Sequence, residues 1–102
     1  MGERGESEGR EMKLRAEVQW FAEEMERTLR RHDDRPGWKD ETQPWLLDRL
    51  REEVEELAKI LHFGTPARRI LREATDVANF AMMIADVARL DAAPPTVREA
   101  GR

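Results

Sequence analysis

Apolar residues recur at helical spacing in three stretches of this chain. The stretches run from about residue 11 to 31, from 44 to 62 and from 66 to 90. Their apolar positions are, in order, Leu14, Val18, Phe21, Met25 and Leu29; Leu47, Leu50, Val54, Leu57 and Leu61; Ile70, Ala74, Val77, Ala81, Ile84 and Ala88. No stretch alternates with the period of a β-strand, so the pattern predicts an all-α fold with three main helices.

Turn-forming residues separate the predicted helices. The segment 32–43 is rich in Asp, Pro and Gly, which is typical of a loop. Pro44 is predicted in the first turn of the second helix, with Thr42 or Gln43 near its cap.

The link between the second and third helices is only a few residues long. Gly64 is predicted to end the second helix, Thr65 to cap the third, and Pro66 to begin it. A link this short predicts that the two helices form an antiparallel hairpin.

The 102 residues of the chain suffice for one domain with a modest core. We expect a disordered segment over 1–10, a helical domain over 11–91 and a flexible tail over 92–102. The net charge is −4 without a long basic block, so binding of a nucleic-acid polymer is not indicated. No run is long enough to span a bilayer, and Met1–Glu11 lacks the layout of a signal peptide, so we expect a cytoplasmic protein without a membrane partner.

Two acidic pairs, Glu53-x-x-Glu56 and Glu73-x-x-Asp76, lie on the two predicted hairpin helices. Glu56 is about 9 Å from the hairpin turn along its helix, and Glu73 is about 10 Å from it. The pairs are therefore level with each other. Because the chain has no cysteine, a metal ion here would be held by oxygen or imidazole ligands.

The four carboxylates can be read in two ways. At about 100° per residue, Glu53 lies roughly 60° and Glu73 about 40° from the centre of the apolar stripe of its helix. Carboxylates so close to a dry face are costly unless a cation compensates them, which favours a Mg²⁺ site. A solvated acidic surface paired with Arg49, Lys59, Arg69 or Arg72 is the alternative.

At these residues the chain resembles the MazG-like, all-α nucleoside triphosphate pyrophosphohydrolase superfamily, in particular its small phage and bacterial branch. That family carries an ExxE pair and an ExxD pair on successive helices, as this chain does. The stretch DVANFAMMIAD over 76–86 extends the resemblance, which covers about residues 14–90. The loop of that branch reads like NDHKGGW, and HDDRPGW at 32–38 keeps Trp38 and a cation at position 35.

The resemblance implies a Mg²⁺-dependent hydrolase, with Mn²⁺ as an alternative ion. The reaction would convert a (d)NTP to the (d)NMP and pyrophosphate in nucleotide-pool house-cleaning. Metal binding and catalysis would fall to Glu53, Glu56, Glu73 and Asp76. Substrate contacts are expected from Lys39, Arg35, Trp38 and Asn79. Alternatively, Lys39 and Arg35 are simply solvated cations, Trp38 packs over the helix hairpin and Asn79 is a plain surface amide.

Two other functions stay open on the sequence: a phosphoribosyl-ATP pyrophosphohydrolase activity and a non-catalytic helical oligomerisation or interaction module. The apolar faces are also wide for three short helices, since Trp20, Phe80 and Met82 fall outside the narrowest stripes. We therefore expect a homodimer or homotetramer in which helices of neighbouring chains complete a four-helix core.

Overall fold

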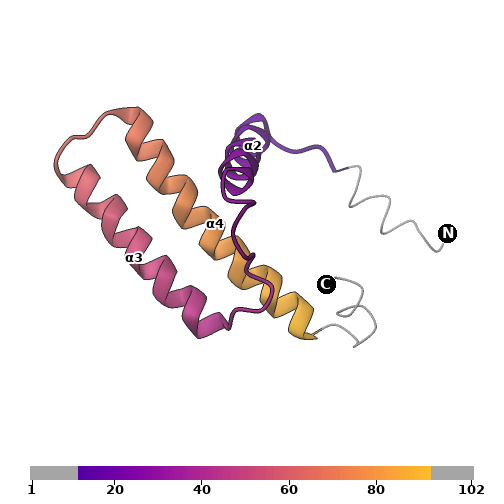
Figure 1. Cartoon of the computed structure of the whole chain (residues 1–102). Coiled ribbons are helices and arrows are strands. Elements are labelled where there is room, and N and C mark those ends of the chain that lie inside the picture. Colours follow the sequence, from indigo (N-terminus) through magenta and orange to yellow (C-terminus); the bar gives the residue numbers. More distant parts are fainter. Residues whose placement is uncertain (1–11, 93–102) are drawn as a thin grey trace.

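Three helices make up the computed structural model, which describes residues 12–92. They are α2 (Ala16–Arg30), α3 (Gln43–His62) and α4 (Ala67–Ala92) (Figure 1). No strand occurs within residues 12–92, so the all-α prediction is confirmed for this part of the chain. None of these helices combines the length and the apolar character needed to cross a bilayer. The expectations for 1–10 and 92–102 fall outside the described residues, except at Ala92, which is helical.

The ends of α3 follow the local signals of the sequence. Thr42 is its N-cap, and the Thr42 hydroxyl oxygen accepts a hydrogen bond from the Trp45 N–H at 3.2 Å. Pro44 lies in the first turn, where its missing N–H costs nothing. Gly64 follows the helix with φ 65°, in the left-handed region where a residue with a Cβ is strained.

Thr65 does not cap α4 as predicted. Its N–H and its hydroxyl both donate to the carbonyl of Ile60, at 3.2 and 2.9 Å. Both bonds satisfy an otherwise free carbonyl in the last turn of α3, as in a Schellman motif. The Pro66 carbonyl instead accepts the first bonds of α4, from the N–H groups of Arg69 and Ile70.

The first helix begins later than predicted. Glu11, its predicted start, lies outside the described residues, and residues 12–15 are not helical. Arg15 is extended, with ψ 148°, and its side chain makes no capping hydrogen bond. Met12 and Leu14 are exposed, so no tertiary packing extends the helix backwards.

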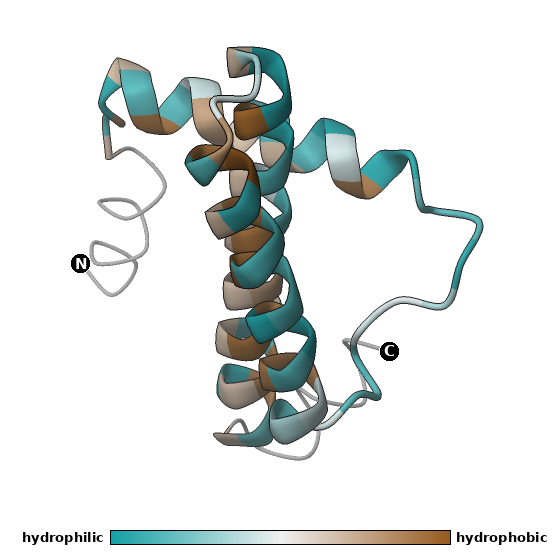
Figure 2. Cartoon of the chain, turned by 90° about the vertical axis from the view of Figure 1, so that its left-hand side faces the viewer, coloured by the Kyte–Doolittle hydropathy of each residue, from teal (hydrophilic) through white to brown (hydrophobic). Residues whose placement is uncertain are grey.

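The central helix of the fold is α4. It packs along α3 as an antiparallel hairpin and also against α2, whereas α2 and α3 do not pack on each other. Figure 1 shows α2 nearly end-on where it crosses the hairpin, and Figure 2 shows the same crossing from the side. The predicted hairpin is therefore confirmed. In Figure 2, hydrophobic positions recur along one side of the hairpin and hydrophilic positions along the other.

The buried face of α3 is rotated from the predicted stripe. Leu46 and Ile60 are buried on α3, and the half-buried Glu53 lies midway between them on the same line. Three residues of the predicted apolar stripe each follow one of these positions by one residue, which is about 100° around the helix, and their side chains remain exposed. They are Leu47 (38% exposed), Val54 (47%) and Leu61 (56%).

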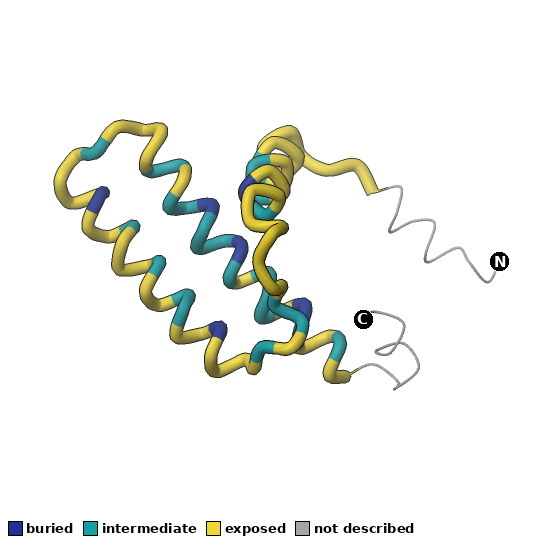
Figure 3. The backbone as a smooth tube through the Cα atoms, in the orientation of Figure 1, coloured by how far each residue is buried: buried dark blue, intermediate teal, exposed yellow. Residues whose placement is uncertain are grey.

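On α4 the predicted stripe holds only in part: Ile70, Ala74, Val77 and Ile84 are half-buried, but Ala81 and Ala88 are exposed. The buried positions are Thr75, Asn79, Asp86 and Val87, three of them polar. Figure 3 shows α4 carrying most of the buried positions. This helix is enclosed on two sides, because α3 covers one side while α2 and the following loop cover another.

Candidate metal centre and adjoining groove

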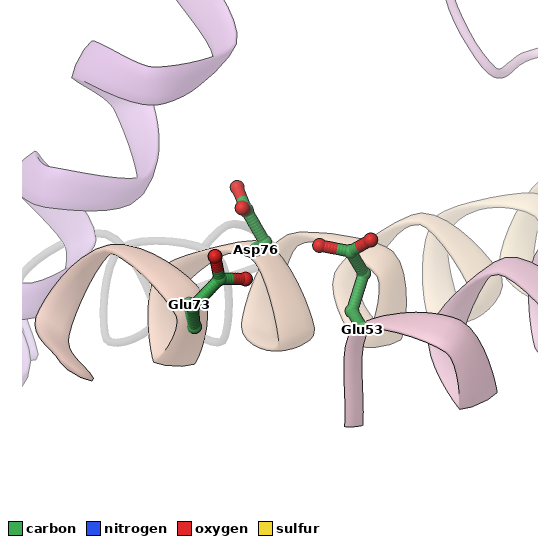
Figure 4. A group of neighbouring side chains, drawn as sticks. All are labelled: Glu53, Glu73 and Asp76. Carbon is green, nitrogen blue, oxygen red and sulfur yellow. The ribbon is translucent and has the colours of Figure 1, made fainter. Parts of the chain in front are cut away.

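Three carboxylates from the two hairpin helices converge. Glu53 comes from α3, and Glu73 and Asp76 come from α4, one turn apart. One oxygen of each lies within 4.8 Å of an oxygen of the other two. All three residues are half-buried, and in Figure 4 their carboxylates point toward a common space between the helices. We call these three residues the acidic trio.

The electrostatics of the acidic trio are unfavourable for three negative charges. Burial raises the pKa of Glu53, and the neighbouring charge of Asp76 raises it further. Burial and the charge of Asp76 also raise the pKa of Glu73. Burial raises the pKa of Asp76, while a hydrogen bond from a protonated Glu53 opposes that shift. Desolvation and like-charge repulsion therefore both favour protonation or a bound cation.

Basic side chains near the acidic trio compensate it only in part. The Arg49 guanidinium is 3.9 Å from Glu53, but it also pairs with Glu52. Glu73 and Asp76 form no ion pair within 4.0 Å with another described residue. Arg31 and His32 lower the pKa of Asp76 from a distance, yet the net shift is upward. Arg69 and Arg72 also lower the pKa of Glu73, so the basic side chains named in the alternative compensate the cluster in part while the net shifts stay upward.

Glu56, the fourth predicted ligand, lies outside the acidic trio. Its side chain is exposed and is 3.7 Å from the Lys59 ammonium. Its charge still contributes to the raised pKa of Glu73, so Glu56 borders the cluster. The structure therefore brings together three of the four predicted carboxylates and leaves Glu56 at the edge.

The donor set of the acidic trio suits a hard divalent cation. Carboxylate oxygens are the protein ligands that Mg²⁺ prefers, and Mg²⁺ usually keeps several of its waters. Three half-buried carboxylates, of which only Glu53 has a cation of a described residue within 4.0 Å, offer negative charge that such an ion would stabilise. Glu53, Glu73 and Asp76 are thus the residues that fit a Mg²⁺ ion.

A groove of about 620 Å³ adjoins the acidic trio. It lies between the end of α2, the loop 31–42, the start of α3 and the middle of α4. Arg49 lines the groove while approaching Glu53, and Phe80 lines it one turn after Asp76. The other aromatic and basic lining residues are Trp38, Trp45, His32 and Arg35. Glu26, Asp33 and Glu41 line it as well, so the groove offers aromatic faces and charges of both signs near the carboxylates.

The predicted substrate-binding residues fall into two groups. Trp38 and Arg35 line the groove. Lys39 does not line it, and its ammonium donates to the Asp86 carboxylate at 2.7 Å. Asn79 is buried, and its amide N–H donates to the Met25 carbonyl at 3.3 Å, which joins α4 to α2.

Several residues of this region were not predicted from the sequence. Trp45, Arg49 and Phe80 line the groove, and Asp86 holds Trp38 and Lys39. Helical spacing could have indicated two of them, because Arg49 lies four residues before Glu53 and Phe80 four after Asp76. Asp86 follows an apolar run of α4 over 80–85, and an acidic residue in such a run could have indicated a buried, paired carboxylate.

Comparison of the chain with protein-family models, with curated proteins and with solved structures finds no match. The acidic trio and its groove are therefore interpreted from their own geometry.

Proposed function

We propose that this chain is a Mg²⁺-dependent nucleotide pyrophosphohydrolase, which converts a (d)NTP to the (d)NMP and pyrophosphate. The observation that carries the proposal is the convergence of Glu53, Glu73 and Asp76 within 4.8 Å beside a groove with aromatic and basic walls. A bound metal ion would offset the repulsion between a triphosphate and an acidic protein, and an aromatic ring offers a face on which a nucleobase can stack. The resemblance of the two acidic pairs to the MazG-like family supports the same reaction.

The groove residues would divide the substrate between them. Arg35 from the loop 31–42 and Arg49 from α3 can contact phosphate oxygens. Trp38, Trp45 and Phe80 offer ring faces for a nucleobase. The guanidinium of Arg49 stacks over the Phe80 ring at 4.9 Å, which orients it at the boundary between the acidic trio and the groove.

The acidic trio would serve the hydrolytic step. A water attacks the α-phosphorus, the bond to the bridging oxygen breaks, and pyrophosphate leaves. A Mg²⁺ ion held by Glu53, Glu73 and Asp76 would supply charge neutralisation on the phosphates and would lower the pKa of the water. A carboxylate of the trio would accept the proton of the attacking water.

Pyrophosphate release from a panel of dNTPs and NTPs tests this proposal. Wild-type chain with Mg²⁺ is expected to release pyrophosphate, and Glu53→Gln and Asp76→Asn to lose at least about a hundredfold in kcat. Glu55→Gln, an exposed carboxylate of α3, is the matched control and is expected to behave as wild type. Including phosphoribosyl-ATP in the panel separates the related activity. No release from any substrate would refute the proposal and leave the non-catalytic module.

We also propose that the chain functions as a homodimer or homotetramer with a four-helix core. The described residues bury only three hydrophobic side chains, Leu46, Ile60 and Val87. Large apolar side chains remain exposed on α2 and α3, namely Val18 and Trp20 on α2 and Trp45, Leu47, Val54 and Leu61 on α3. A second copy would cover such a surface. Sedimentation velocity at micromolar concentration is expected to show a dimer or tetramer, and a monomer would contradict this.

A further inference from the structure

Asp86 is a buried carboxylate that three side chains contact at once. Its side chain is 7% exposed on α4. Oδ2 accepts hydrogen bonds from the Trp38 indole N–H at 2.9 Å and from the Lys39 ammonium at 2.7 Å. Oδ1 accepts a hydrogen bond from the Arg89 guanidinium at 2.8 Å. Two of the three donors belong to the loop 31–42, far from Asp86 in sequence.

The loop 31–42 forms one wall of the groove. Seven of its residues line the groove, including Trp38 and Arg35. Within the loop, the backbone forms only short-range turn bonds, such as Arg35 N–H to the His32 carbonyl and Glu41 N–H to the Trp38 carbonyl. Such turns shape the loop locally but do not fix its distance from α4. Contacts between the loop and another element must fix that distance. Asp86 provides such contacts as charge-assisted hydrogen bonds to Trp38 and Lys39.

We propose that Asp86 is a positioning residue, which anchors the loop 31–42 on α4 and so sets the groove wall that contacts the nucleotide. The inference rests on the proposed function for its catalytic consequence. Asp86 itself does not line the groove. It acts through Trp38, which lines the groove and whose indole N–H is bound to the Asp86 carboxylate. Lys39 is then part of the anchor and balances the buried charge, instead of contacting a phosphate.

Limited trypsin digestion tests the anchor without reference to catalysis. Trypsin cleaves after Lys39 only when the ammonium leaves Asp86 and the loop opens. Asp86→Asn keeps the size of the side chain and removes its charge, so cleavage at this bond is expected to accelerate by about tenfold or more. The matched control is Asp48→Asn, at a 71% exposed aspartate of α3 whose nearest cation is Arg51 at 3.7 Å. Equal cleavage rates in wild type, Asp86→Asn and Asp48→Asn would overturn the proposal.

Steady-state kinetics test the consequence for the nucleotide. Asp86→Asn is expected to raise KM about tenfold and to change kcat by less than about threefold, since the acidic trio is untouched. A fall in kcat at unchanged KM would overturn the positioning role. Absence of pyrophosphate release by the wild-type chain would instead refute the proposed function, and the trypsin result would still decide the anchor.

A double-mutant cycle separates positioning from general loss of structure. Trp38→Phe removes the indole N–H, keeps a ring and leaves Asp86 with Lys39 and Arg89, so this variant is expected to fold even if Asp86→Asn does not. It should also accelerate cleavage after Lys39. If Asp86 acts through Trp38, the KM of the double variant stays within about twofold of the larger single effect. A KM equal to the product of the two single effects would overturn the proposal.

Discussion

Neutralising one carboxylate of the acidic trio should stabilise the metal-free protein. The change is Glu53→Gln, which keeps the shape of the side chain and removes its charge. Glu53 is half-buried between Leu46 and Ile60, on the face that packs against α4. Because its pKa is raised by burial and by Asp76, the folded chain favours the uncharged form. Glutamine provides an uncharged side chain at every pH.

The magnitude follows from the geometry. Two unit charges 4.8 Å apart repel by about 3 kcal/mol at an effective dielectric constant of about 20. Glu53 faces two such charges, from Glu73 and Asp76, and Arg49 at 3.9 Å offsets about one of them. Partial solvation and partial protonation reduce the remainder, so we expect a gain of about 1–2 kcal/mol in the free energy of unfolding.

The pH dependence has a definite sign. The folded pKa of each trio carboxyl lies above its unfolded value, so the contribution of the trio to stability is fully present below the unfolded value, about 4.3 for Glu. Metal-free stability is lost as pH rises through the raised folded pKa values. At neutral pH the wild-type chain therefore carries more of this repulsion than at acidic pH, and Glu53→Gln relieves it.

Added Mg²⁺ should reverse the order of the two proteins. At a hundredfold excess over Kd, a site in the wild-type chain contributes about 2.7 kcal/mol. The Glu53→Gln variant lacks one of the three carboxylate ligands, so added Mg²⁺ should increase its free energy of unfolding only slightly. The variant is thus more stable in a chelator, and the wild type is equal or more stable in Mg²⁺.

Thermal unfolding by circular dichroism measures both effects. A gain of 1–2 kcal/mol corresponds to a rise in Tm of roughly 5–15 °C for a domain of this size. Glu55→Gln removes an exposed carboxylate from the same helix and should leave the Tm nearly unchanged in both conditions. A lower Tm of Glu53→Gln in the chelator would refute the repulsion argument. A Tm of the wild type that does not respond to Mg²⁺ or Mn²⁺ would refute the metal site.

Three further predictions concern the framework of the site. Gly64→Ala should cost about 1 kcal/mol in chemical denaturation because φ is 65°, whereas Gly37→Ala, also in open space but without a positive φ, should cost less. Thr42→Ala should cost about 1 kcal/mol by the same measurement, because it removes the hydroxyl cap of α3. The Asp86 contacts lower its pKa to about 2, mainly through Lys39, so they contribute about 2 kcal/mol above the unfolded pKa of about 3.9. That contribution should disappear as pH falls toward 2, and Asp86→Asn should abolish this acid-dependent loss in a pH series of unfolding curves.

The helices and their ends were largely predictable, because they depend on local signals. Thr42, Pro44 and Gly64 act as the sequence indicates, since caps and turns are determined by residues a few positions apart. The Thr65 hydroxyl can either donate to a free carbonyl of α3 or accept from a free N–H of α4, and the geometry of the turn selects the Ile60 carbonyl of α3. The start of α2 was missed because helical periodicity continues to Leu14 without any packing partner there.

The candidate site was predictable where two residues share a short helical spacing. Glu73 and Asp76 are neighbours on any helix, and the short hairpin link brings Glu53 level with them. Which carboxylate of α3 faces inward depends on the rotation of that helix about its axis. The structure turns Glu53 toward α4 and leaves Glu56 beside Lys59.

By itself the sequence determined three helices, a tight hairpin and four acids at matching heights, since periodicity, caps and rise per residue are local properties. Only the tertiary structure decided the rotation of α3, the crossing of α2 over α4, and the docking of the loop on Asp86. These depend on contacts between residues far apart in the sequence, such as Trp38 and Asp86 in the docked loop. A helical pattern shows that one face is buried, but only the partner that covers that face selects which residues lie at its centre.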